Sequence, residues 1–252
     1  MLITIKVGMS ILIGFLAGML TVYTFNKMPA SWLCDYGEKP RQELTDPYVQ
    51  RLRGMPWRWV YAVGFIALCL RLSLAGEEMV FVQLAVAGLF ACWTLLIIAI
   101  ADLKYMIIPD QFVILLALVA VGFAPFYLNS SEKTGGESIL TAIGPDGVWQ
   151  PVIGMCIGGG FMLMVAGVGS LIARTEVLGF GDVKLCAAMG LLLGPVGTIV
   201  SIALATIASG IVSAVGLIVG GYKLREAKPL GPYLCGSAIA FIFVVMPLCI
   251  SA

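Results

Sequence analysis

The segment EMVFVQLAVAGLFACWTLLIIAI, residues 78–100, decides the class of fold. After its first glutamate it continues for 22 residues without a charged side chain. A helix needs about 20 mainly apolar residues to cross the hydrocarbon core of a bilayer, and this segment has that length. The sequence therefore predicts a transmembrane helix here, which raises the question of how many similar segments the chain contains.

Runs of the same kind fill most of the chain. It has 252 residues, of which 60% are hydrophobic and only 12% charged, whereas soluble domains carry about 25% charged residues. The other apolar runs lie at about 3–25, 58–75, 108–128, 151–173, 183–196, 198–221 and 233–251. We therefore expect an all-α polytopic membrane protein with about eight transmembrane helices. Because Gly194-Pro195 marks a turn, the sixth run is short, and one kinked helix over 183–221 is the alternative.

The loop charges predict an orientation in the membrane. If the spans alternate, twelve of the fifteen lysines and arginines fall in loops on one side, at 26–58, 101–107, 174–184 and 222–232. Basic loops face the cytoplasm by the positive-inside rule. We therefore expect both termini and residues 129–150 outside, and one short cytoplasmic loop domain. The expected division is 1–57, the first span with this loop, and 58–252, the membrane core.

The residue types that the chain lacks exclude several kinds of catalytic and metal site. The chain contains no histidine, which excludes a Ser-His or Cys-His pair, the H-E-x-x-H metalloproteases and most zinc sites. No two of the seven cysteines are spaced as C-x-x-C, so they indicate buried small side chains. Any catalysis here uses carboxylates, lysines, hydroxyls or thiols.

Two aspartates lie at span edges on the same predicted side. Asp102 lies in IAIADLKYMIIPDQF, and Asp182 lies in LGFGDVK. Ionisable groups at the membrane are costly and mark functional sites, although each residue also suits a helix cap or a loop. If the two carboxyls meet, their repulsion makes them share one proton, so that one is the general base and the other the acid.

The residues beside these aspartates are candidates for binding a substrate. Gly179 and Gly181 allow close backbone approach and unusual dihedral angles, so an extended peptide can lie against them. Asp110 follows Ile108-Pro109, where it either supports the site or shapes a turn. Lys184 either anchors the chain at the membrane face or acts on the nearby acid. We expect no metal ligands among these residues.

Three motifs carry a resemblance to a known family. They are DLKYMIIPD (102–110), GFGDVKLCAAMG (179–190) and KPLGPYL (228–234), the last with Leu230 where phenylalanine is usual. Together they resemble the type IV prepilin peptidases, a group of GxGD intramembrane aspartyl proteases, over most of residues 80–250. A fainter likeness is GMLTVYTFNKMP (18–29), with Val22 in place of asparagine. Asp102 and Asp182 match the catalytic aspartates of that family.

The resemblance implies an aspartic-type endopeptidase in the inner (cytoplasmic) membrane of a bacterial or archaeal cell. Its partners are prepilin or pseudopilin substrates and the lipid bilayer, with no nucleic acid. It removes a basic leader peptide after a glycine, on the cytoplasmic side. Larger members hold zinc in two CxxC pairs and methylate the new N-terminus with S-adenosylmethionine. Because the first loop here is short and keeps only Cys34, we expect no cofactor.

Other functions fit parts of the same pattern. The GxGD motif also occurs in related intramembrane proteases with other substrates, such as presenilin-like enzymes and archaeal preflagellin peptidases, although the IPD and GPxL segments favour the prepilin branch. Acids beside glycine-broken helices also serve proton or cation transporters, but relay acids lie deep in the membrane. Neither the particular substrate nor the oligomeric state follows from the sequence.

Overall fold

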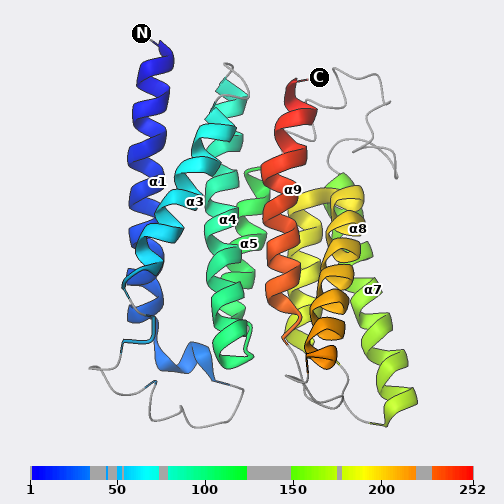
Figure 1. The fold of residues 1–252 in the computed structure, drawn as a ribbon. Helices are drawn as coiled ribbons and strands as arrows, with labels where there is room; N and C mark the ends of the chain where they lie inside the picture. Colours follow the sequence, from blue (N-terminus) through cyan, green and yellow to red (C-terminus); the bar gives the residue numbers. More distant parts are fainter. Residues whose placement is uncertain are drawn as a thin grey trace.

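The computed structural model describes residues 2–34, 44, 50–52, 54–73, 79–123, 149–174, 178–219 and 229–251. Nearly all of the predicted external loop 129–150 lies outside these residues, as do residues 35–43, 45–49 and 53 of the predicted cytoplasmic loop 26–57. The described elements are α1 (Leu2–Lys27), η1 (Ala30–Leu33), α3 (Trp57–Ser73), α4 (Met79–Tyr105), α5 (Asp110–Val121), α7 (Trp149–Ala173), α8 (Phe180–Ile218) and α9 (Gly231–Ser251). Within the described ranges every element is helical, which confirms the all-α class (Figure 1).

The lengths of these helices agree with a membrane protein. Four of them are long and apolar enough to cross a bilayer within the described residues: Lys6–Lys27, Val86–Tyr105, Trp149–Ile172 and Phe180–Ile218. Asp110–Val121 and Gly231–Val244 are shorter and also apolar. The count of eight crossings and the side on which the termini lie stay predictions.

The ends of the helices fall into two groups. The C-terminal ends of α1, α4 and α7 and the N-terminal ends of α3, α5, α8 and α9 lie at the lower end of the bundle (Figure 1). The start of α1 and the end of α9 both lie at the upper end. We call the lower end the motif end, because α4, α5 and α8 present Asp102, Asp110 and Asp182 there. The basic loops predicted to share one side follow or precede these same helix ends.

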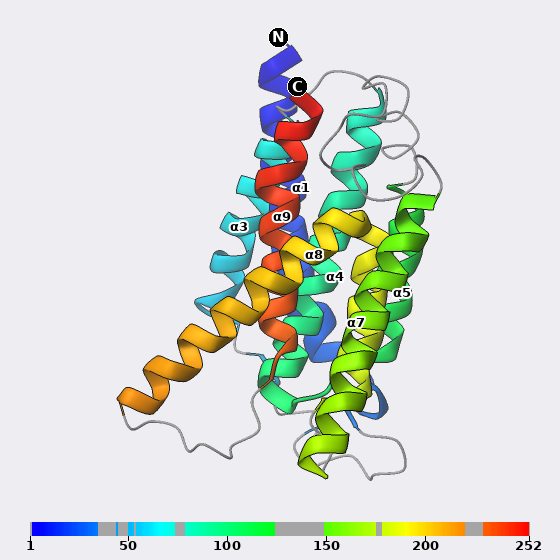
Figure 2. The same ribbon diagram turned by 90° about the vertical axis from the view of Figure 1, so that its right-hand side faces the viewer.

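Helix α8 is broken at Gly194, as its sequence suggested. Gly194 has φ 68° and ψ −178°, and Pro195 follows it. The positive φ is the left-handed region that glycine adopts without the steric cost of a Cβ. The two parts of the helix run in different directions, and the later part returns toward the motif end (Figure 2). Residues 180–218 are thus two helical segments joined at a sharp kink.

Glycines allow the helices beside the site to approach closely. A Cβ at Gly154 or Gly158 of α7 would lie 2.2 or 2.3 Å from a backbone oxygen of α8. A Cβ at Gly190 would lie 2.1 Å from the backbone oxygen of Gly154. The same close contact joins Gly14 and Gly18 of α1 to α3. Small residues spaced four apart permit such contacts in membranes, and here they fix the first half of α8.

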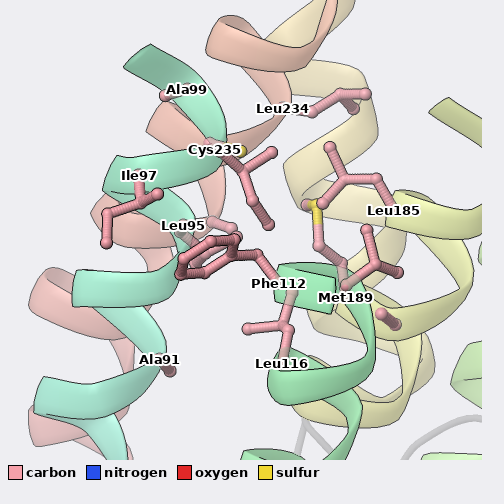
Figure 3. Close-up of a cluster of buried hydrophobic side chains, with 14 of the residues drawn as sticks. Ala91, Leu95, Ile97, Ala99, Phe112, Leu116, Leu185, Met189, Leu234 and Cys235 are labelled. Atoms are coloured by element: carbon pink, nitrogen blue, oxygen red, sulfur yellow. The ribbon is translucent and has the colours of Figure 1, made fainter. Parts of the chain in front are cut away.

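Four helices share the apolar core above the motif end. Figure 3 shows buried side chains of α4, α5, α8 and α9 gathered together, among them Leu95, Phe112, Met189 and Leu234. These four side chains are between 0% and 5% exposed. Helix α7 packs against α8, and α1 packs against α3, and these helices add buried side chains such as Met162, Phe25 and Phe65 to the same core. The core therefore holds together the helices whose ends carry the aspartates.

Candidate active site

Asp102 lies in the last turn of α4 and is 5% exposed. The helix ends at Tyr105, and the next residue, Met106, takes a φ of 56°. The Met106 amide donates to the carbonyl of Asp102 at 2.8 Å, which closes the last turn. The expected span ended at residue 100, but the helix continues five residues further. Asp102 is therefore part of a rigid helix instead of the following loop.

Asp182 lies in the first turn of α8, after the N-cap residue Gly179. Its backbone amide donates to the Gly179 carbonyl at 3.1 Å. A carboxylate in this position is stabilised by the partial positive charge of the helix N-terminus. The two aspartates thus project from the end of one helix and the start of another, both at the motif end.

The two carboxyl groups share one buried site. They are close enough for the charge of Asp102 to act on Asp182. The Cys235 thiol of α9 lies close enough to interact with both of them. Oδ2 of Asp102 and Oδ1 of Asp182 are buried and accept no hydrogen bond from the described residues. Buried carboxylate oxygens normally have partners, so these two are the atoms most in need of a water molecule or a substrate.

An apolar layer closes the site on its inner side. One helical turn from Asp102, Asp182 and Gly231, on the side of the core, lie three buried side chains. They are Ala99 on α4, Leu185 on α8 and Leu234 on α9. Such surroundings exclude water and strengthen the interaction between charges. The carboxyls therefore lie between the apolar core and the motif end.

Asp110 and Lys184 form an ion pair with each other. Lys184 Nζ donates to Oδ1 and Oδ2 of Asp110, at 3.0 and 2.8 Å. It also lies 5.1 Å from the centre of the Phe180 ring, as in a cation–π contact. The pair joins the start of α5 to the first turn of α8. A role of Asp110 and Lys184 in binding substrate stays a prediction. The structure shows in addition that their ion pair connects two helices.

The glycines of the GFGD motif differ from each other in their surroundings. A Cβ at Gly181 would lie 3.2 Å from the Cβ of Ile108, so the IPD segment packs on this glycine. A Cβ at Gly179 would meet only Asp182 Oδ2, at an ordinary 3.8 Å. Gly179 has φ −68° and ψ 141°, and Gly194 is the glycine with positive φ in the described ranges. Space at Gly181, and not an unusual dihedral angle, is what this motif requires.

Two residues of α9 lie at the site although no sequence pattern indicated an individual role for them. A Cβ at Gly231 would lie 2.5 Å from Oδ2 of Asp102, and Cys235 lies one turn further along the helix. Gly231 belongs to the motif KPLGPYL, but that motif indicated only the resemblance to the family and no role for the glycine itself. Neither a glycine nor a lone cysteine signals such a contact, because it depends on how α9 packs against α4.

The end of α1 and the segment that follows it contact the end of α4. Lys104 donates to the carbonyl of Arg51, and the side chain of Asn26 exchanges two hydrogen bonds with the backbone of Leu52. The rings of Phe25 and Tyr105 stack with their centroids 6.3 Å apart. The contacts of Lys104 and Tyr105 lie two to three residues from Asp102 and hold the last turn of α4 in place.

A model of the type IV leader peptidase family matches residues 89–215, about half of the chain. The matched segment includes Asp102, Asp110 and the whole GFGD motif, but it ends before α9. Comparisons with curated proteins and with solved structures give no match. Among the described residues, no three acidic or cysteine side chains come together in the manner of metal ligands.

Proposed function

The chain belongs to the type IV leader peptidase family, and from this premise we propose that it is an aspartyl endopeptidase acting on prepilins or pseudopilins. The observation that carries the proposal is the pair Asp102 and Asp182, whose buried oxygens Oδ2 and Oδ1 lack partners among the described residues. Their two helices present them together at the motif end. The helical fold of long apolar segments supports a protease of the membrane.

The pair provides acid and base for peptide hydrolysis without histidine. The ionised carboxylate takes a proton from a water molecule, whose oxygen attacks the scissile carbonyl carbon and forms a tetrahedral intermediate. The protonated carboxyl polarises the carbonyl oxygen and then supplies the proton that the leaving amine needs when the C–N bond breaks. One proton is thus taken from water and one is given to the amine.

The substrate that fits this site has a polar leader and an apolar helix. The leader is basic and ends in glycine, and the apolar helix follows it in the membrane. Because the apolar layer blocks the inner side, the peptide enters from the motif end, which we place in the cytoplasm on the loop charges. Eight crossings with both termini outside complete this topology.

No cofactor is needed for the proposed hydrolysis. The first loop keeps one cysteine, Cys34, and the chain has no histidine, whereas a structural zinc site takes four ligands. We therefore propose a peptidase without zinc. Methylation of the new N-terminus by S-adenosylmethionine is not part of the proposal.

Incubation of the purified protein with a prepilin tests the proposed function. Mass measurement of both products identifies the bond that is cleaved. We expect a basic leader ending in glycine and a mature chain that begins with its apolar helix. A preflagellin offered in parallel distinguishes the related substrate class. An intact prepilin after incubation with correctly folded protein contradicts the proposal.

A further inference from the structure

Gly231, the first residue of α9, lies directly against the carboxyl group of Asp102. A Cβ at this position would lie 2.5 Å from Oδ2, 3.1 Å from Cγ and 3.4 Å from Cβ of Asp102. These three atoms are the nearest neighbours such a Cβ would have. The φ of Gly231 is not positive, since Gly194 is the described glycine in that region. Glycine is therefore needed here for space and not for its backbone conformation.

The backbone of Gly231 also offers a donor to the carboxyl group. In the first turn of α9, the amides of Tyr233 and Leu234 donate to the carbonyl of Leu230, at 3.1 and 3.2 Å. Pro232 has no amide hydrogen. The amide of Gly231 remains, at the end of the helix that lies against the Asp102 carboxyl. The positive end of a helix thus faces a carboxyl group, an arrangement that favours negative charge there.

Within the described part of the chain, the Asp102 carboxyl is held in place by packing and not by a hydrogen bond to Oδ2. Its side chain is 5% exposed, and Oδ2 accepts no hydrogen bond from the described residues. The closed last turn of α4 fixes its backbone. The position of the carboxyl group is therefore set mainly by what it packs against on α9.

We propose that Gly231 is a positioning residue, whose missing side chain lets the start of α9 hold the Asp102 carboxyl in its place beside Asp182. The inference rests on the proposed function only where it concerns activity. It goes beyond the two aspartates because it assigns a role to a third helix, outside the segment that the family model matches.

The smallest side chain is enough to disturb this arrangement. A Cβ at 2.5 Å must move to ordinary contact, so Gly231→Ala displaces the carboxyl or the start of α9 by about 1 Å. A displacement of about 1 Å at reacting groups costs up to roughly 100-fold in rate. Substrate binding elsewhere in the site is unaffected, so kcat falls while KM stays the same.

The chain offers a matched control on the same helix. Gly236 also lies in α9, and a Cβ there would have no neighbour within 4 Å. Prepilin cleavage is measured over a range of substrate concentrations for the native protein, Gly231→Ala and Gly236→Ala. We expect kcat of Gly231→Ala to fall by about 30- to 100-fold with KM unchanged. Gly236→Ala keeps the native values.

A second measurement does not depend on activity. The fall in melting temperature caused by Gly231→Ala is compared in the native chain and in the Asp102→Ala background, as a double-mutant cycle. Because Asp102→Ala removes the atoms that the new methyl group meets, the fall is smaller in that background. If Gly231→Ala alone does not fold, the double variant does.

The outcomes of these measurements distinguish a failure of the inference about Gly231 from a failure of the proposed function. Native kcat in Gly231→Ala, or an equal loss in Gly236→Ala, overturns the inference about Gly231. Equal falls in melting temperature in the two backgrounds overturn it as well. If the folded native protein cleaves no substrate, the proposed function fails, and the melting cycle still decides whether Gly231 packs on Asp102.

Discussion

Lys184 of α8 and Asp110 of α5 form an ion pair in which Nζ lies 2.8 Å from Oδ2. Each residue lies close to one of the two aspartates along the chain, Lys184 two residues after Asp182 and Asp110 eight residues after Asp102. The pair therefore connects the two motifs that the active site is built from. Its side chains are 34% and 26% exposed, so solvent screens the interaction in part.

Breaking this pair is expected to reduce activity more than stability. Partly exposed pairs contribute about 0–1 kcal/mol to folding, so Lys184→Ala should lower the melting temperature only slightly. Cleavage should fall by about ten-fold, because the start of α8 loses a contact that positions Asp182. The exposed Arg71→Ala on α3 is the control. The exchanged pair Asp110→Lys with Lys184→Asp should recover part of the rate, and an exchange no better than the single variants would contradict a role for the pairing.

The contact between Gly181 and Ile108 predicts a ranking of variants. Gly181→Val should lose most of the activity, because overpacking at this contact costs about 1–3 kcal/mol and moves the IPD segment. Gly179→Ala should lose less than Gly181→Ala, since its Cβ meets only an ordinary contact. Cleavage rates at equal amounts of membrane protein test this order. The reverse order would mean that peptide approach at Gly179, and not packing at Gly181, sets the requirement for glycine.

The glycine contacts between α7 and α8 should control stability. A Cβ at Gly190 would lie 2.1 Å from a backbone oxygen, which no side-chain rotation relieves. Gly190→Ala should therefore lower stability by at least about 1–3 kcal/mol, seen as a lower melting temperature in detergent. Gly160→Ala on α7 is the matched control, because a Cβ there has no neighbour within 4 Å. Similar melting temperatures for the two variants would contradict this packing.

The orientation in the membrane is tested by labelling intact cells. The basic loops predict that residue 131 faces outside and Cys34 faces the cytoplasm. A thiol reagent that does not cross the membrane should label Ser131→Cys and leave Cys34 unmodified until the cells are opened. Labelling of Cys34 alone would reverse the orientation and the proposed side of cleavage.

The two candidate aspartates could be selected from the sequence because charge in an apolar chain is conspicuous. Asp102 and Asp182 could be selected at the edges of two apolar runs, and the structure places them together. Gly194-Pro195 signalled the break in α8, but not the direction of the segment that follows. Gly231 could not be recognised, because its role depends on the approach of α9 to α4. A local pattern contains no information about such a contact.

The fold was predictable as a class and less so in its details. The length of the apolar runs indicated helices, and the described ends lie within a few residues of the expected ones for most of them. The end of α4 was misplaced at residue 100, because Asp102 and Lys104 lower the hydropathy while the helix continues to Tyr105. Hydropathy reflects the preference for lipid, whereas the helix continues as long as its backbone hydrogen bonds do, the last turn being closed by the Met106 amide on the Asp102 carbonyl.

The central claim is that Asp102 and Asp182 carry out the hydrolysis as a pair. Its most direct measurement is the cleavage rate of a prepilin by the native protein, Asp102→Asn, Asp182→Asn and the double variant, all folded and present at equal amounts. Asparagine keeps the shape of the side chain but neither accepts nor releases the proton. We expect loss of cleavage in each single variant and no further loss in the double variant, because the pair acts as a unit. Near-native turnover by either single variant would contradict the central claim.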